Sequence, residues 1–204
     1  MLKSLLLVSS VFVSGMVSAQ TISLEYQGFY NHLKKANKGN FNLIEIAFSV
    51  PNRPACQITK GTISTESKQL PLTYTKAQRL YIPYDDKLKH DRALINLDIK
   101  GEAKDCSIAV QVQTRANTTH YTGEQLAEIE QQMAQLLKQM QGFPIRYFSD
   151  DIKGLTFRFA APVTIYQNQQ QLKQSQLQLS QQQIADLTQL DFSDAPMQIV
   201  PWVK

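Results

Sequence analysis

Residues 44–50 read IEIAFSV and residues 93–99 read ALINLDI, and in both stretches an apolar side chain occupies every second position. A period of two places these side chains on one face of a β-strand. Residues 41–114 repeat the pattern about six times, with turn-forming residues such as Pro51 and Gly101 between the stretches. Short strands at this spacing predict a small antiparallel β-sandwich of immunoglobulin-like architecture. The Trp typical of true immunoglobulin domains is absent here, so we predict the architecture alone.

Two cysteines lie within or beside these strands, at Cys56 and Cys106. Cys56 shares strand parity with Ile58, and Cys106 shares it with Ile108, Val110 and Val112, so both thiols are expected on the buried faces of their strands. We predict a disulfide that joins two strands through the core and closes a loop of about fifty residues. A redox-active pair is the alternative, but the spacing is not the C-x-x-C of such pairs.

The first nineteen residues have the three parts of a secretory signal. Lys3 gives the positive start, residues 5–13 are apolar, and small residues end at Ala19, so that cleavage would leave Gln20 as the first residue. The apolar run is too short to span a bilayer, and no later stretch of the sequence approaches that length. The sequence therefore predicts an exported periplasmic protein with no transmembrane segment after processing, in a compartment where disulfides persist.

Charge is nearly balanced, with a formal net charge of +4. Lysines are interspersed with acids, as in residues 85–92 (DDKLKHDR), which we expect to form a solvated loop. Nucleic-acid binders carry a clustered basic stripe, so no nucleic-acid partner is expected.

A short helix is predicted directly before the strands. Tyr26, Phe29, Tyr30 and Leu33 fall at the i, i+3, i+4 and i+7 positions of one helical face, and Gly39 is suited to end the helix. Such an aromatic face usually packs on a sheet. The alternative is that its rings form the floor of a ligand pocket.

A longer helix is predicted after the strands. Thr122 and Gln125 can form a capping box at its start, and Gly142 follows its end. Its apolar residues recur at steps of three and four: Leu126, Ile129, Met133, Leu136 and Met140. With only about two heptads, packing within its own chain is favoured over a homodimer seam.

The last third of the chain is again mostly strand-like, as in residues 155–159 (LTFRF). The Gln-rich residues 167–183 are predicted to form an ordered hairpin before a short helix capped by Ser180 and Gln183.

The predicted fold class is therefore α+β, mainly antiparallel β. The expected organisation is a signal peptide (1–19), a disulfide-stapled sandwich domain with an N-terminal helix (20–118), a connecting amphipathic helix (119–142) and a small α+β part packed on the rest (143–204).

Common catalytic motifs are missing from the sequence, including G-x-S-x-G, H-E-x-x-H and S-x-x-K. The three histidines are far apart in the sequence, so no metal site and no cofactor are expected. No residue is assigned a catalytic role. If the protein is an envelope hydrolase, its site is assembled from separate loops, with His120, Asp150 and Asp151 as the first candidates.

Several stretches together resemble a known family. They are residues 24–30 (LEYQGFY) followed by 33–34 (LK), the strand residues 46–48 (IAF), the two separated cysteines, residues 80–85 (LYIPYD) before 87–89 (KLK), and the closing Pro201-Trp202. This order resembles an uncharacterised family of exported gammaproteobacterial proteins, domain of unknown function 2987, over nearly the whole chain after the signal. The resemblance implies an envelope location and assigns no activity, cofactor or site.

The favoured function is a non-enzymatic periplasmic interaction or binding module, whose partner is an unidentified envelope protein or small ligand. Two alternatives remain at this point. One is the envelope hydrolase, and the other is a small-ligand carrier with Tyr26, Phe29 and Tyr30 as the floor of its pocket, which requires that these rings are accessible.

Overall fold

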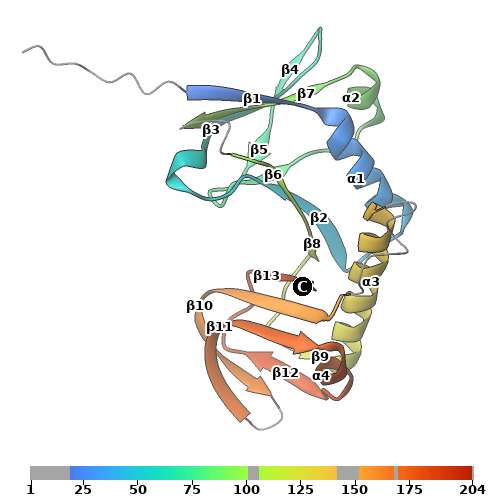
Figure 1. Cartoon of the computed structure of the whole chain (residues 1–204), viewed down its shortest axis with the longest axis vertical. Helices are drawn as coiled ribbons and strands as arrows, with labels where there is room; N and C mark the ends of the chain where they lie inside the picture. The colour runs from blue at the N-terminus through green and yellow to red at the C-terminus, as the bar shows by residue number, and fades with distance from the viewer. Residues whose placement is uncertain (1–18, 101–105, 142–151, 168–169, 204) are drawn as a thin grey trace, which may run out of the picture.

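The computed structural model describes residues 19–100, 106–141, 152–167 and 170–203. Strands of the N-terminal half form two antiparallel sheets, and those of the C-terminal half form a third, which confirms an α+β fold that is mainly antiparallel β (Figure 1). The signal peptide predicted for residues 1–19 lies outside the described residues except for Ala19. Among the described residues, no helix combines the length and apolar character needed to cross a bilayer.

The N-terminal half contains two four-stranded sheets. The first has the order β1 (Ala19–Glu25), β7 (Leu94–Lys100), β3 (Gln57–Ser64) and β4 (Gln69–Pro71). The second has the order β5 (Thr73–Tyr74), β6 (Arg79–Tyr81), β2 (Ile44–Ser49) and β8 (Ala109–Thr114). The period-two pattern had predicted about six strands in residues 41–114, where the described residues form seven, β2 to β8, and it had not predicted β1. The immunoglobulin-like arrangement stays a prediction.

Apolar side chains of both sheets form the core of this half. Ile95, Leu97 and Ile99 on β7 are completely buried, as the alternation of residues 93–99 predicted. Ile44 and Phe48 on β2 are also buried, and Phe29 of α1 (Tyr26–Lys38) packs edge-on against Phe48 with ring centroids 5.1 Å apart. The helix therefore covers β2 with its aromatic face and ends before Gly39, as predicted.

The charged residues 85–92 are not the loop that the sequence predicted. They contain α2 (Asp86–His90), because the Asp85 carboxylate accepts hydrogen bonds from the backbone N–H groups of Lys87 and Leu88 and caps the helix. Leu88 is buried and anchors this short helix to the domain. The sequence prediction was based on the mixed charges and overlooked the buried side chain of Leu88 and the capping carboxylate of Asp85.

The C-terminal half is one five-stranded sheet with two helices. Its strands follow the order β11 (Gln170–Ser180), β10 (Gly154–Gln167), β12 (Gln189–Phe192) and β9 (His120–Thr122), and β13 (Gln198–Trp202) pairs with β10. The Gln-rich segment is ordered, as predicted, but it forms the single strand β11, whose hairpin partner is the preceding strand β10 and not a second strand within residues 167–183. It continues into α4 (Gln181–Ala185) through the predicted capping box of Ser180 and Gln183.

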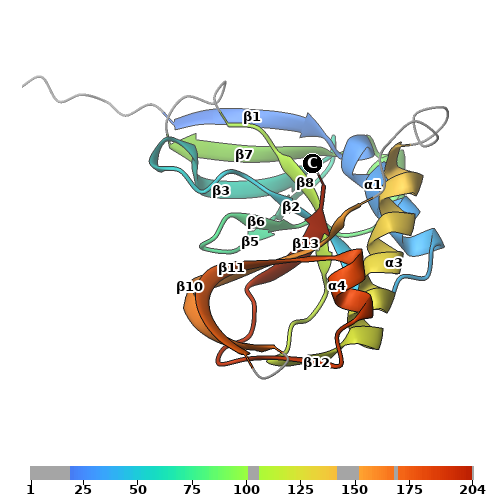
Figure 2. The same ribbon diagram turned by 60° about the horizontal axis from the view of Figure 1, so that its bottom comes forward.

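The long helix α3 (Gly123–Gln141) lies beside both halves (Figures 1 and 2). Its capping box is formed, since Gln125 N–H donates to Thr122 Oγ1 and Thr122 N–H donates to Gln125 Oε1. The apolar face is buried within the chain at Leu126, Ile129, Met133 and Leu136. This face therefore packs within the chain, as favoured from the sequence. Its four buried residues are not exposed for a contact with a second copy.

Candidate ligand-binding pocket

The aromatic face of α1 is structural. Tyr26, Phe29 and Tyr30 are all buried, so the alternative in which the three rings together form an accessible pocket floor is wrong, and of the three Phe29 alone reaches the wall of a small depression described below. Tyr26 Oη donates to the carbonyl oxygen of Pro83 at 2.7 Å and accepts from the backbone N–H of Asp85 at 2.9 Å. The helix thereby fixes the segment that leads into α2.

Tyr30 completes this anchoring. Its hydroxyl is hydrogen-bonded to the Asp86 carboxylate, which raises the pKa of Tyr30 well above its ordinary value. Its ring stacks on Tyr84 with centroids 5.0 Å apart. Tyr84 nevertheless remains 41% exposed, and it lines a pocket that does not depend on the buried rings.

This pocket has a volume of about 560 Å³ and lies between the C-terminal end of α1, the following turn, β2 and β6. That volume falls within the usual range of small-molecule sites. We call it the Arg79 pocket, and its lining residues are Leu33, Ala36, Asn37, Asn40, Phe41, Asn42, Glu45, Ile46, Phe48, Arg79, Leu80, Tyr81, Ile82, Tyr84 and Arg115.

An ion pair forms the polar side of the Arg79 pocket. Strands β2 and β6 pair antiparallel, and Arg79 Nη2 lies 2.7 Å from Glu45 Oε1. Gln113 Nε2 on β8 donates to the same oxygen at 3.0 Å. The Arg79 guanidinium also lies over the Tyr81 ring, 5.0 Å from its centroid. Three strands and one aromatic ring therefore hold Arg79 and Glu45 in place.

Arg115 adds a second guanidinium at the same pocket. It follows β8, and its Nη2 donates to the carbonyl oxygens of Phe41 and Ile44, both at 3.2 Å. Within the described ranges, the structure contains no hydrogen bond to Arg115 Nε, Arg115 Nη1 or Glu45 Oε2. The pocket thus offers two guanidinium groups, one carboxylate oxygen and the half-exposed rings of Tyr81 and Tyr84.

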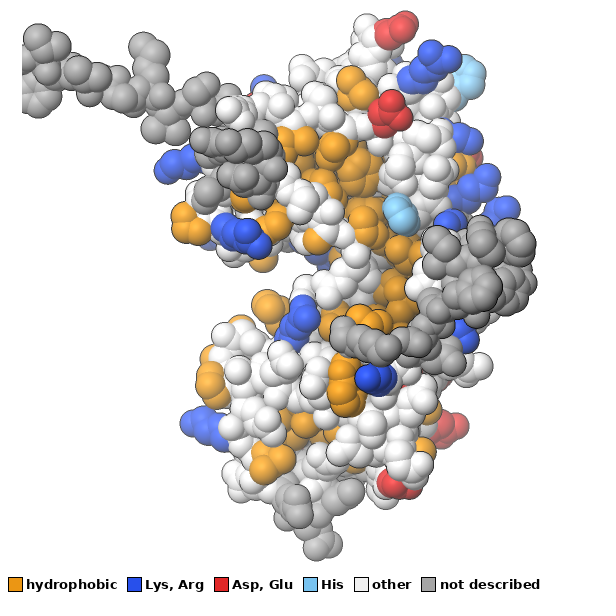
Figure 3. All heavy atoms as spheres, viewed as in Figure 1, with side chains coloured by type: hydrophobic (Ala, Val, Ile, Leu, Met, Phe, Trp, Pro, Cys, Tyr) orange, Lys and Arg blue, Asp and Glu red, His pale blue; other side chains and the backbone are white. Residues whose placement is uncertain are grey.

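A second, smaller depression of about 290 Å³ lies between β1, α1 and β8. Its lining is mainly apolar, with Leu24, Phe29, Phe48, Ile108 and Val110. Figure 3 shows hydrophobic side chains gathered over this part of the surface, above the hollow between the two halves. Glu25 and His32 also line this depression, which lacks the two arginines of the Arg79 pocket.

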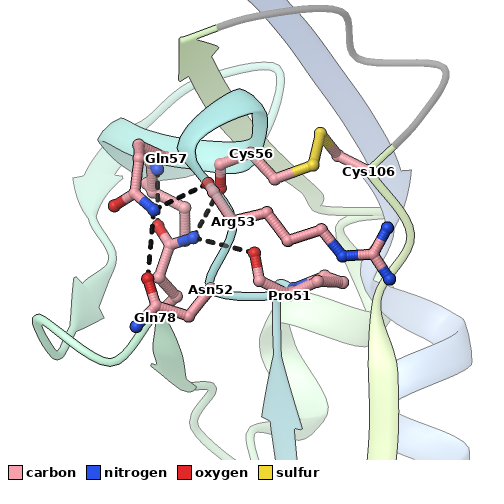
Figure 4. Close-up of a disulfide and its surroundings, with 8 residues drawn as sticks. Pro51, Asn52, Arg53, Cys56, Gln57, Gln78 and Cys106 are labelled. Atoms are coloured by element: carbon pink, nitrogen blue, oxygen red, sulfur yellow. Dashed lines mark hydrogen bonds between the residues drawn. A yellow bond between two sulfur atoms is a disulfide. The ribbon is translucent and has the colours of Figure 1, made fainter.

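The predicted disulfide between Cys56 and Cys106 is present, with the two Cα atoms 5.5 Å apart (Figure 4). Both cysteines are buried, but neither lies on a strand, as the parity argument had assumed. Cys56 ends the 3₁₀ turn η1 (Pro54–Cys56), and Cys106 precedes β8. The parity argument also failed at Val110, which is 41% exposed although Val112, two residues later on the same face of β8, is buried.

His120, a candidate for the hydrolase alternative, lies on β9 with Asp191 of β12 as its partner. His120 Nδ1 is 2.6 Å from Asp191 Oδ1, and Gln189 Nε2 donates to Asp191 Oδ2 at 2.6 Å. These two contacts, His120 foremost, lower the pKa of Asp191. Asp150 and Asp151 lie outside the described residues. In the part of the chain described, no group of three or more metal-ligating side chains occurs.

Comparison with known proteins assigns the chain to a protein family. The profile of a family described as "Protein of unknown function (DUF2987)" matches residues 18–159. The chain belongs to this family. The match ends within β10, short of the near-complete coverage expected, but it includes every residue that lines the Arg79 pocket. No curated protein and no solved structure matches this DUF2987 protein.

Sequence reasoning missed Glu45, Arg79 and Arg115 as candidate site residues. Glu45 has the strand parity of a solvent-facing residue, which is a weak signal because every half-buried strand has such positions. The pairing of β2 with β6 and β8, which brings the three residues to one pocket, cannot be read from the period of two.

Proposed function

We propose that this DUF2987 protein is an exported, non-enzymatic binding protein of the periplasm, and that it binds a small polar ligand in the Arg79 pocket. The observation that carries the proposal is the convergence of Arg79, Arg115 and Glu45 beside two half-exposed tyrosines. Binding sites use a few fixed polar groups to orient a ligand within a concave surface. Arg79 and Glu45 are fixed by each other and by Gln113.

Export is supported by the secretory pattern of residues 1–19 and by the disulfide, since such bonds persist in oxidising compartments. Cleavage after Ala19 is compatible with the fold. Strand β1 spans Ala19–Glu25, and Gln20 pairs with Ile99 of β7, so a chain that begins at Gln20 retains all but one residue of the strand. We keep the proposed organisation of 20–118, 119–142 and 143–204 for the mature chain.

The proposal is tested by NMR with ¹⁵N-labelled protein and a low-molecular-weight extract of the host envelope. Chemical-shift changes centred on residues that line the Arg79 pocket, with the composition of the extract unchanged after incubation, would support a binding protein. Consumption of an extract component would instead indicate an enzyme. Changes centred elsewhere, or none, would overturn the proposed site.

A further inference from the structure

We infer that the ligand of the Arg79 pocket is an acidic saccharide, a sugar ring that carries a carboxylate. This inference rests on the proposed function and names the ligand class of the same site. It follows from the three kinds of group that line the pocket: a guanidinium with unused donors, a carboxylate with an unused oxygen, and aromatic rings.

Arg115 indicates the negative charge of the ligand. Arg79 is already paired with Glu45, so the positive charge of Arg115 is not neutralised by a carboxylate of the pocket lining. Its Nη2 is held by the carbonyl oxygens of Phe41 and Ile44, whereas Nε and Nη1 donate to no acceptor among the described residues. Nε and Nη1 lie on opposite sides of the group, with Cδ between them, so either nitrogen can donate a charge-assisted hydrogen bond to a carboxylate oxygen, but the two cannot bind one carboxylate as a fork.

Glu45 indicates hydroxyl groups on the same ligand. Its Oε1 accepts from Arg79 and Gln113, whereas Oε2 has no donor among the described residues. An ionised carboxylate only accepts hydrogen bonds, so Oε2 favours a ligand with O–H donors such as the hydroxyl groups of a sugar. Asn37, Asn40 and Asn42 add further amide donors and acceptors to the lining.

Tyr81 and Tyr84 indicate a ring with an apolar face. They are 49% and 41% exposed, and each is supported from within the protein, Tyr81 by Arg79 and Tyr84 by Tyr30. An aromatic ring held in this way offers a flat, rigid contact surface with an apolar body. A sugar ring presents C–H groups on its faces and hydroxyl groups around its edge, so one molecule satisfies the tyrosines, Glu45 and Arg115 together.

The test is titration of ¹⁵N-labelled protein with D-glucuronate and D-galacturonate. The neutral sugars D-glucose and D-galactose are matched probes that lack the carboxylate, and inorganic phosphate is an anion that lacks the sugar ring. We expect at least one uronate to shift signals of the Arg79 pocket and to bind about tenfold more tightly than its neutral partner. Arg115→Gln should remove most of that preference. Arg158→Gln, at an exposed position on β10 outside the pocket, should leave it unchanged.

Each other outcome overturns the inference. Equal affinity for uronates and neutral sugars would show that Arg115 does not bind a ligand carboxylate. Tighter binding of phosphate than of the uronates would show that the pocket is a simple anion site. No binding of any sugar would exclude the ligand class, whereas the extract experiment decides the proposed function separately. A folded Arg115→Gln variant, with unchanged thermal midpoint, that retains the uronate preference would also contradict it.

Discussion

Gln78 donates a hydrogen bond from its Nε2 to the carbonyl oxygen of Cys56, a residue 22 positions earlier in the chain. The same side chain accepts from the backbone N–H of Ile58 at 2.6 Å and donates to the carbonyl oxygen of Pro51 at 3.2 Å. Gln78 is 2% exposed (Figure 4 shows it beside the disulfide). One buried amide therefore satisfies three backbone groups around the cysteine bridge.

Replacing Gln78 by Ala should destabilise the protein by about 1–3 kcal/mol, because buried backbone groups of Cys56 and Ile58 would lose their partner. Urea denaturation measures the free energy of unfolding. Gln176→Ala, at an exposed position on β11, is the matched control and should change it little. Equal effects of the two substitutions would show that the Gln78 contacts do not matter.

The disulfide should contribute more to the free energy of unfolding than the contacts of Gln78 do. Replacing Cys56 and Cys106 together by Ala should cost about 2–5 kcal/mol, the usual penalty for a native bridge in a small secreted domain. The pocket should keep its ligand-induced NMR shifts, since neither cysteine lines it. Thiol labelling of the denatured, non-reduced protein checks the bond. Two reactive thiols per chain would show that it is absent.

Replacing two glycines by Ala should change the stability of the protein in opposite directions. At Gly123 a Cβ atom would lie 2.1 Å from the carbonyl oxygen of Leu187, so Gly123→Ala should force α3 away from the segment after α4 and lower the thermal midpoint. At Gly28, inside α1, a Cβ would meet no atom within 4 Å. Gly28→Ala should raise stability by about 0.5–1 kcal/mol through helix propensity. A reversed order of midpoints would contradict the packing at Gly123.

Glu130 makes stability depend on pH. It is 8% exposed on α3, and burial raises its pKa above the ordinary 4.5, while a hydrogen bond with Gln181 partly opposes the shift. The folded state therefore holds this proton more tightly than the unfolded chain, and stability falls as the pH rises from 4.5 through the raised folded pKa.

Glu130→Gln cannot ionise, so the variant should gain stability relative to the wild type as the pH increases from about 4 to 7. Thermal midpoints at several pH values across this range measure the difference. A difference that stays constant with pH, or that favours the wild type at pH 7, would show that Glu130 carries no buried charge.

Local patterns were sufficient for much of the fold. The period of two found β2 and β7, and the capping residues Thr122 and Ser180 marked the starts of α3 and α4, because these signals lie within a few neighbouring residues. Strand β1 was missed because it begins at the predicted cleavage site and has only two large apolar residues, Ile22 and Leu24, which are too few to establish a period of two.

The site could not be predicted because it depends on contacts between distant segments. Glu45 meets Arg79 across 34 positions and Gln113 across 68, and only the order β6-β2-β8 brings them together. Tyr26 and Tyr30 were correctly predicted to share a packing face, but the residues that they contact were not predicted. Helical spacing shows that Tyr26 and Tyr30 share a face, whereas it does not show that α2 and the segment before it cover that face.

Native mass spectrometry of the protein released from the host periplasm by osmotic shock tests the central claim most directly. We predict a chain that begins at Gln20, is two hydrogens lighter than the reduced form, and carries a reproducible small-molecule adduct. The adduct should be lost in Tyr81→Ala and retained in Tyr166→Ala, whose tyrosine on β10 is 48% exposed and lies outside the Arg79 pocket. A chain that still begins at Met1, or that carries either no adduct or the same adduct in both variants, would contradict the account.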